Sequence, residues 1–122
     1  MMLLVDTSIW IDHFRQGDAA LGQALVDGTV LSHPFVIGEL ALGNIRQRGL
    51  ILEALSALPS AILAEPAEVL HLVAVERLHG RGIGYVDAHL IASVRLTPGS
   101  VLWTRDKRLE SVANELGIAL PA

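Results

Sequence analysis

The chain has 122 residues, of which 52% are hydrophobic, and its formal net charge is −4. This length suits one domain, expected to span residues 1–122, and the apolar fraction excludes a disordered chain. No apolar stretch approaches the ~20 residues of a membrane span, and the lack of cysteine excludes disulfides and thiolate zinc sites, so a cytoplasmic protein without membrane association is expected. The acidic balance argues against a general nucleic-acid binder, but not against an enzyme that meets phosphate through bound metal ions.

The first part of the chain alternates between apolar runs and capped helical segments. Residues 3–5 are a continuous apolar run, typical of a strand buried on both faces, and residues 8–14 follow as a short helix. Asp18 suits the N-cap of a second helix, and Gly28 suits its C-terminal end. Residues 29–32 are the second predicted strand.

Prolines mark the boundaries of the middle segments. Pro34 suits the first turn of a helix that ends near Gly43. A further helix is predicted over residues 47–58, since Pro59 stops it. Residues 61–64 are the third predicted strand.

The rest of the chain continues the same alternation of helices and short apolar strands. The predicted elements are a helix over 66–80, a glycine loop over 80–84, a helix from 85 that ends before Pro98, a strand over 101–104, a helix over 107–116 and a short strand over 118–120. Short apolar strands that alternate with helices indicate an α/β fold whose parallel sheet is covered on both faces. In such sheets, ligands bind beyond the carboxyl ends of the strands.

Four acidic residues stand in unusual places. Asp6 directly follows the first predicted strand, and Asp106 follows the fourth. Asp87 begins a helix after the glycine loop, and Glu39 lies in an otherwise apolar helical segment. Carboxylates among apolar neighbours are costly unless they are paired, hydrogen-bonded or bound to metal. Their joint placement predicts that all four face one crevice.

A simpler explanation is available for each aspartate. Asp6, Asp87 and Asp106 all stand where a helix begins, and aspartate is among the preferred residues at helix N-termini. Glu39 has no such explanation, because it is neither a cap nor part of an obviously polar face. Capping and a ligand-binding role are compatible.

Several carboxylates in one crevice repel each other and favour a hard cation. Mg²⁺ and Mn²⁺ prefer such oxygen ligands. A carboxylate-held pair of these ions suits the hydrolysis of a phosphodiester bond. The net acidity of the chain is consistent with this chemistry, because the metal supplies the positive charge that phosphate requires.

The segments VDTSIWID, GEL, YVDAHLIAS and LWTRDKRL, in this order and spacing, resemble the PIN domain. Within that family the chain is most similar to the small VapC-type toxins of bacterial toxin–antitoxin pairs, and the resemblance covers nearly the whole chain. It implies a three-layer α/β/α sandwich around a parallel sheet with strand order 3-2-1-4-5. It also implies an endoribonuclease that depends on Mg²⁺ or Mn²⁺, with transfer RNA as the expected substrate.

The resemblance also implies partners and site residues. The protein is expected to form a homodimer and to be inhibited by a cognate VapB-type antitoxin. The complex is expected to bind operator DNA only through the antitoxin. The catalytic, metal-binding acidic quartet of the family matches Asp6, Glu39, Asp87 and Asp106. Ser8 and Thr104 match hydroxyl residues that orient a carboxylate or a metal-bound water. Leu109 stands where many relatives carry an aromatic residue, which concerns packing more than chemistry.

Four basic residues are candidates for contacts with RNA phosphates: Arg81, Arg105, Lys107 and Arg108. A solvated surface explains them equally well. The five histidines show no metal-ligand spacing. Trp10 and Phe14, one helical turn apart, are expected in the core, with a partner-binding groove as the alternative.

Two other functions compete with the nuclease. A PIN-like fold that has become a catalytically silent binding module agrees with the apolar surplus, but the intact acidic quartet argues against it. A phospho-receiver domain has a similar length and layout. That class usually needs adjacent acids at the end of the first strand, whereas Asp6 has no acidic neighbour.

Overall fold

A parallel sheet of three strands forms the centre of the protein, whose structure, a computed structural model, describes residues 1–121. The strands are β1 (Met2–Val5), β2 (Val30–Leu31) and β3 (Ser100–Trp103), in the order β2-β1-β3. Leu4 is the partner of Leu31 on one side and of Leu102 on the other. These buried leucines explain why the strand sequences are uniformly apolar: both faces of the sheet are covered.

The two outer strands of the predicted five are reduced to single bridges. Ser32 pairs with Ser60 at one edge, and Leu102 pairs with Ala119 at the other, both in parallel orientation. The neighbour order of the prediction is therefore confirmed, but the strand expected over 61–64 is wrong. It has no partner to extend along, because β2 ends at Leu31 and His33 already caps the next helix.

Seven helices accompany the sheet within residues 1–121. They are α1 (Thr7–Gln16), α2 (Ala19–Asp27), α3 (Pro34–Leu42), α4 (Arg48–Ser56), α5 (Pro66–Val75), α6 (Tyr85–Leu96) and α7 (Lys107–Glu115). None of them is long and apolar enough to cross a membrane. α5 ends five residues earlier than Gly80, the predicted end, and Arg77 just beyond it adopts a left-handed conformation with φ of +52°.

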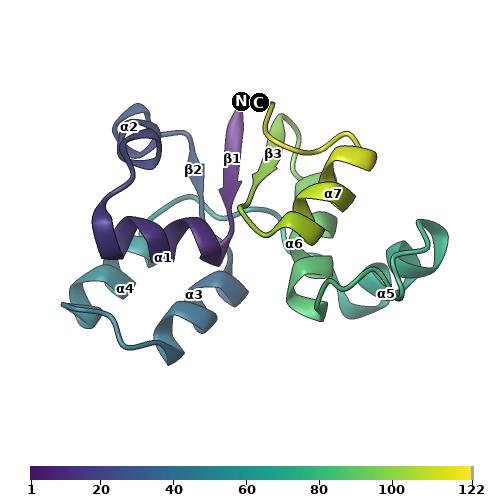
Figure 1. Cartoon of the computed structure of the whole chain (residues 1–122), viewed down its shortest axis with the longest axis horizontal. Coiled ribbons are helices and arrows are strands. Elements are labelled where there is room, and N and C mark those ends of the chain that lie inside the picture. The colour runs from purple at the N-terminus through teal and green to yellow at the C-terminus, as the bar shows by residue number, and fades with distance from the viewer. Residues whose placement is uncertain (122) are drawn as a thin grey trace.

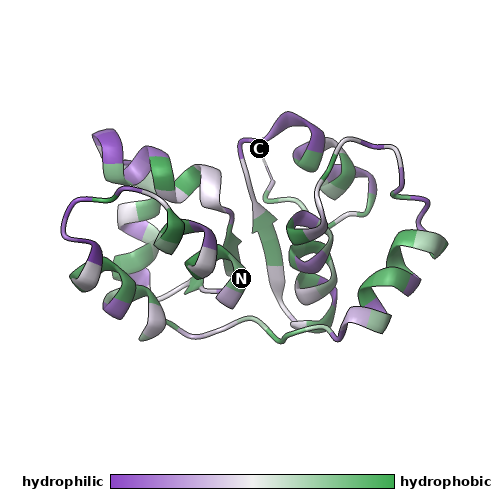
Figure 2. Ribbon diagram, turned by 90° about the horizontal axis from the view of Figure 1, so that it is seen from below, coloured by the Kyte–Doolittle hydropathy of each residue, from purple (hydrophilic) through white to green (hydrophobic). Residues whose placement is uncertain are grey.

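The helices form two groups on either side of the strands. Helices α1 to α4 lie on one side of the molecule, and α5 to α7 lie on the other (Figure 1). In the perpendicular view the apolar strands run between the two groups (Figure 2). This is the layered α/β arrangement that the sequence predicts.

Helix α6 is the most deeply embedded of the helices. Every residue from Ala88 to Val94 is buried, so this helix packs on all sides in its middle. Trp10 and Leu109 are also part of the core, with exposed fractions of 3% and 0%. The prediction that Trp10 is a core residue is therefore confirmed, and Leu109 fills the position where an aromatic residue was expected.

Two glycines of the loop before α6, Gly80 and Gly82, have a positive φ, and Gly82 is the more restricted of the two. Gly82 has a φ of +79°, and an added Cβ would lie 2.7 Å from Cδ of Arg108. We expect Gly82→Ala to lower the free energy of unfolding by about 1–2 kcal/mol, because an L-residue is strained in this conformation. Urea unfolding would measure the loss.

Gly22→Ala is the matched control for this change. Gly22 lies inside α2, and an added Cβ there meets nothing within 4 Å. The same chemical change is expected to stabilise the protein by about 0.5–1 kcal/mol, because alanine favours a helix. Equal effects of the two substitutions would contradict the conformational argument.

Candidate active site

Asp6 is a buried carboxylate at the carboxyl end of β1, with 6% of its surface exposed. Its Oδ1 accepts a hydrogen bond of 2.7 Å from the backbone N–H of Thr7. Its Oδ2 accepts one from the hydroxyl of Ser8, at 2.9 Å, and one from the hydroxyl of Thr104, at 2.7 Å. Asp6 therefore caps α1, as the simpler explanation has it, and is also held from a second strand.

The hydroxyls of Ser8 and Thr104 connect Asp6 to the segment that carries Asp106. The backbone N–H of Arg105 donates to Oγ of Ser8 at 3.1 Å, and that of Asp106 donates to Oγ1 of Thr104 at 3.0 Å. β1 and β3 run parallel. The helices that follow them, α1 and α7, begin close together at the carboxyl ends of these strands (Figure 1). The structure thus brings the residues predicted near Asp6 into one hydrogen-bonded network.

Glu39 joins the same region from α3. Its Oε1 accepts a hydrogen bond of 2.7 Å from the hydroxyl of Thr7. Roles for Ser8 and Thr104 are predicted from the sequence, but this role of Thr7 is not. The available signal was its position directly after Asp6, where its side chain is on a different side of the helix from that of Ser8.

Asp87 is the half-buried member of the quartet, in the first turn of α6. Burial raises the pKa of its carboxyl, against a lowering effect of the hydrogen bond of 3.0 Å from the Gly84 N–H. The negative charges of Asp6, Asp106 and Glu39 raise this pKa further. Asp87 is therefore near enough to each of the other three carboxylates to feel its charge, as expected for a shared crevice.

The donor set suits a hard divalent cation in kind, because it consists of carboxylates with hydroxyls behind them. The caps engage Oδ2 of Asp87 and Oδ1 of Asp106, and no hydrogen bond among the described residues engages the second oxygen of either carboxylate. Within residues 1–121, however, no three acidic or histidine side chains are drawn together closely enough to hold one ion. The arrangement is that of separated ligands, each oriented by its own hydrogen bonds.

Two of the four candidate phosphate contacts are already paired with carboxylates. The guanidinium of Arg81 forms a bidentate ion pair with the carboxylate of Glu115, at 2.9 and 3.0 Å. Arg105 binds Asp12, at 2.7 Å, and Asp18, whose pKa is lowered mainly by that hydrogen bond. The sequence gives no sign of these pairs, because their partners are between 34 and 93 residues away along the chain.

Lys107 and Arg108 are the remaining candidate phosphate contacts. Both are exposed in the first turn of α7, directly after Asp106. Neither forms a salt bridge within residues 1–121. They are the two basic candidates whose charge is available beside the acidic quartet.

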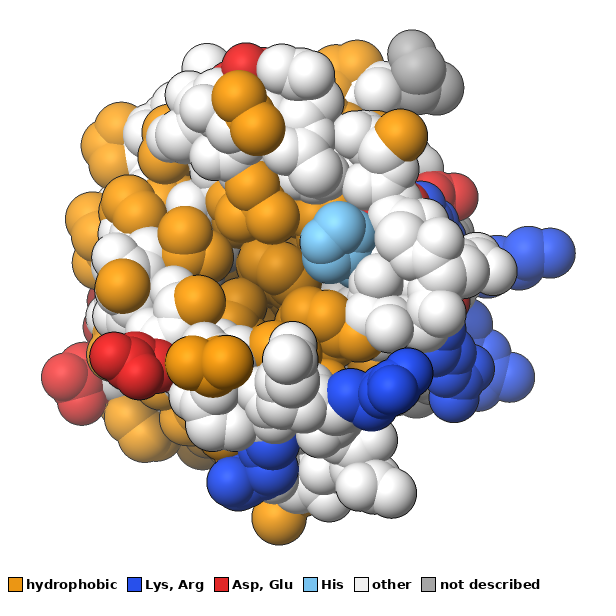
Figure 3. All heavy atoms as spheres, turned by 90° about the vertical axis from the view of Figure 1, so that its left-hand side faces the viewer, with side chains coloured by type: hydrophobic (Ala, Val, Ile, Leu, Met, Phe, Trp, Pro, Cys, Tyr) orange, Lys and Arg blue, Asp and Glu red, His pale blue; other side chains and the backbone are white. Residues whose placement is uncertain are grey.

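A groove of about 770 Å³ begins at Glu39 and runs between α1 and the connection from α3 to α4. Ile11, Phe14 and Ile51 supply apolar walls, and Arg15 and Arg46 supply positive charge. Phe14 and Ile51 also line a neighbouring apolar hollow between α1, α2 and α4. Figure 3 shows this side of the molecule, with hydrophobic side chains around a hollow and basic residues along one edge.

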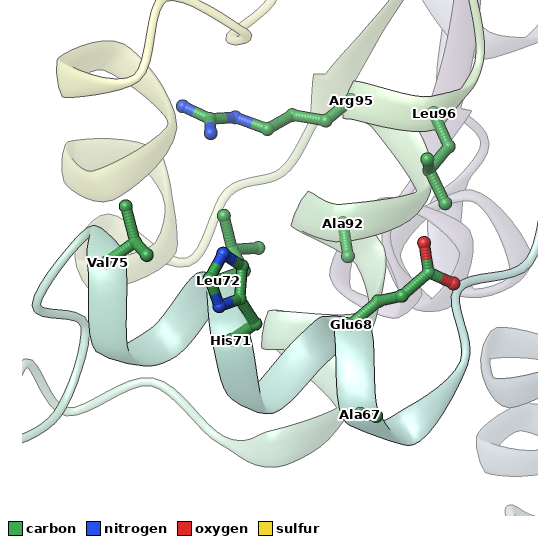
Figure 4. Close-up of a pocket in the computed structure, with 8 residues that line it drawn as sticks. All are labelled: Ala67, Glu68, His71, Leu72, Val75, Ala92, Arg95 and Leu96. Atoms are coloured by element: carbon green, nitrogen blue, oxygen red, sulfur yellow. The ribbon is translucent and has the colours of Figure 1, made fainter.

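A second apolar hollow, of about 490 Å³, lies between α5 and α6. Leu72 and Val75 from α5 face Ala92 and Leu96 from α6, and Arg95 lies across one end (Figure 4). No member of the acidic quartet lines it. The chemistry of the site is therefore separate from this hollow.

The PIN domain family matches residues 3–115 of the chain. The chain belongs to the PIN-domain family. Ribonuclease VapC32 of Mycobacterium tuberculosis, from strains CDC 1551 / Oshkosh and ATCC 25618 / H37Rv, is 51% identical to it over 119 residues, which are 98% of this chain and 96% of the relative. The resemblance to the VapC-type branch of the family is thereby confirmed.

A solved structure supports the fold of this PIN-domain chain. The structure described as "Structure of FitAB bound to IR36 DNA fragment" matches it with a TM-score of 0.60 at 20% identity. The match covers 93% of this chain and 91% of the other. At this level of identity the likeness concerns the fold alone, and it confirms the PIN-like α/β arrangement.

The raised pKa of Asp87 predicts how the PIN-domain protein responds to pH without metal. A carboxyl whose pKa is raised by folding stabilises the protein while it is protonated, and this stability is lost as the pH rises through the raised pKa. In EDTA at pH 7 we therefore expect Asp87→Asn to be as stable as the wild type or more so. The difference should shrink as the pH falls through the raised pKa, because the carboxyl of the wild type then becomes protonated.

Urea unfolding between pH 4 and pH 7 measures this effect, with Glu53→Gln, exposed on α4, as the control. Added Mg²⁺ or Mn²⁺ should raise the melting temperature of the wild type and of the control, but not that of Asp87→Asn. A variant that melts earlier at pH 7 and is still stabilised by metal would show that Asp87 is not part of the site.

Proposed function

We propose that this chain is a Mg²⁺- or Mn²⁺-dependent endoribonuclease toxin that hydrolyses phosphodiester bonds of RNA, with transfer RNA as the expected substrate in the cytoplasm. The observation that carries the proposal is the proximity of three acidic side chains, Asp6, Glu39 and Asp106, to Asp87, whose pKa is raised by burial and by their charges. The 51% identity to a protein named Ribonuclease VapC32 supports it. The same relationship does not favour a catalytically silent binding module.

Asp6, Glu39, Asp87 and Asp106 are the residues that would hold the cation. Such a cation would supply the positive charge and Lewis acidity that hydrolysis of a phosphodiester requires. Because the net charge of the chain is −4, the cation would supply the positive charge that phosphate requires. No salt bridge within residues 1–121 involves any of the four acids.

The residues around the quartet orient its carboxylates. Ser8 and Thr104, together with the Thr7 N–H, fix the position and the rotation of the Asp6 carboxylate, and the Thr7 hydroxyl donates one hydrogen bond to Glu39. Oriented ligands lose less freedom when a substrate and a cation arrive. We further propose that Lys107 and Arg108 bind phosphates of the RNA strand, since the charges of Arg81 and Arg105 are neutralised by carboxylates.

Cleavage of total bacterial RNA by the purified protein tests the nuclease. We expect cleavage with Mn²⁺, none with EDTA, and none for Asp6→Asn, which has nearly the same shape as the wild type but lacks the charge. Asp27→Asn, exposed at the end of α2, is the matched control and should cleave normally. Cleavage that persists in EDTA or in Asp6→Asn would refute the metal-dependent mechanism.

Thr104→Val tests the orienting role separately. The substitution keeps the shape of the side chain but removes the hydroxyl that donates to Asp6. Loss of a group that orients a metal ligand typically costs about 10–100-fold in metal affinity or activity. We expect a reduction of that size in the cleavage rate with Mn²⁺, partly restored at higher Mn²⁺ concentration. An unchanged rate would show that the hydroxyl has no orienting role.

We also propose that the protein forms a homodimer and is inhibited by a cognate VapB-type antitoxin, through which the complex binds operator DNA. The groove that begins at Glu39 suits a segment of the antitoxin with both apolar and acidic side chains. Ile11 and Phe14 would contact the apolar side chains, and Arg15 and Arg46 the acidic ones. A segment in this groove would cover one side of the candidate site, which gives a physical reason for inhibition.

Ile11→Arg tests this location. Ile11 is 39% exposed and lines the groove, so the charged side chain disturbs the surface rather than the core. We expect antitoxin affinity, measured by calorimetry, to fall at least about tenfold, as for a hot-spot contact. Leu70 is exposed on α5 and lies outside the groove, so Leu70→Arg should leave the antitoxin affinity unchanged. Equal affinities for both variants would place the antitoxin elsewhere.

A further inference from the structure

His89 is a buried polar side chain without a hydrogen-bond partner among the described residues. It lies on α6 with only 4% of its surface exposed. No fully buried side-chain nitrogen or oxygen in residues 1–121 lacks a partner, so the imidazole nitrogens of His89 retain contact with the surface. A buried polar group normally has a partner, and this one is left available to a ligand.

Two exposed aromatic rings flank this imidazole. The ring centroids of Phe35 and Tyr85 each lie 4.6 Å from that of His89, both in edge-on geometry. Phe35 is 40% exposed and Tyr85 is 52% exposed. The centroids of these two rings are thus no more than about twice that distance apart.

The position of Phe35 is fixed from below by a second buried histidine. Nδ1 of His33 accepts a hydrogen bond of 3.0 Å from the Phe35 N–H, so Nε2 donates to Oγ of Ser93, at 3.1 Å. The rings of His33 and Phe35 also meet edge-on, with centroids 5.3 Å apart. The exposed ring therefore stands on a rigid support, which lowers the entropy cost of using it to bind a ligand.

Phe35 lies beside one member of the acidic quartet. Tyr85 belongs to the same first turn of α6 as Asp87. Phe35 lies one turn before Glu39 on α3, and side chains at that spacing are neighbours on a helix surface. Phe35 is therefore a neighbour of Glu39, and Tyr85 joins it through the imidazole of His89, which both rings contact.

We propose that Phe35, Tyr85 and His89 form a subsite for one unpaired nucleobase of the RNA strand, next to the phosphodiester that is cleaved. The base stacks on the exposed rings, and the imidazole of His89 forms a hydrogen bond with its edge. Stacking of this kind tolerates any base, because every base has a π-face, while the hydrogen bond gives a preference. The proposal rests on the proposed nuclease function and specifies a single-stranded substrate for it.

Binding of mononucleotides in EDTA tests the subsite without any cleavage. We expect the ring signals of His89, Phe35 and Tyr85 in NMR spectra to shift and saturate on titration with at least one of the 5′-monophosphates of adenosine, guanosine, cytidine and uridine. Ribose 5-phosphate, which has no base, should not shift them. Absence of any shift at millimolar nucleotide, or an equal shift with ribose 5-phosphate, would overturn the proposal.

Tyr85→Leu provides the matching variant, since its exposed ring can be removed without opening the core. We expect its affinity for the nucleotides to fall at least about fivefold, as for the loss of a stacked base. Leu42→Ala, 90% exposed at the end of α3, should not change it. If Tyr85→Leu binds as well as the wild type, the ring is not part of the subsite and the proposal is wrong.

Two further outcomes separate this inference from the nuclease itself. Nucleotide-induced shifts in a protein that does not cleave RNA would support the subsite and count against the nuclease. Cleavage without shifts would do the reverse. If size-exclusion chromatography shows that Tyr85→Leu changes the oligomeric state while the wild type shows no shifts, the rings contact a second copy of the chain and the proposal fails.

Discussion

A carboxylate removed from water needs hydrogen-bond donors on both oxygens, and Asp6 finds them in a backbone N–H and two hydroxyls. These donors come from the first turn of α1 and from Thr104, directly after β3, so the charge is satisfied only when β1, β3 and the start of α1 are in place. The same hydroxyls then position the backbone at Arg105 and Asp106. The geometry of the candidate site is in this way a consequence of satisfying one buried charge.

Capping and function draw on the same residues for a physical reason. The carboxyl end of a parallel strand is where the next helix begins, so an aspartate there caps the helix and also faces the crevice in which ligands bind. In Asp87 and Asp106 the cap uses one carboxylate oxygen. The second carboxylate oxygen of Asp87 and that of Asp106 accept no hydrogen bond within residues 1–121.

The distribution of ion pairs sets the electrostatic character of the site. Arg105 binds Asp12 and Asp18, and Arg81 binds Glu115, whereas the quartet has no salt bridge in the part of the chain that the structure describes. Four unpaired carboxylates are therefore found where burial already opposes ionisation of Asp87. A cation is the natural complement of such a field. Phe35, next to Glu39, and the basic first turn of α7, next to Asp106, border this acidic centre.

The sequence by itself determined the order of strands and helices, the parallel sheet and the position of acids such as Asp6 and Asp106 at strand ends, because these depend on local apolar runs and caps. Only the tertiary structure decided the rest. The predicted strand over 61–64 became a single bridge at Ser60, since β2 is too short to extend it. The contacts Thr7–Glu39, Arg81–Glu115 and Phe35–His89 join residues more than 30 positions apart. Such contacts depend on how helices cross the sheet, which no local pattern of residues records.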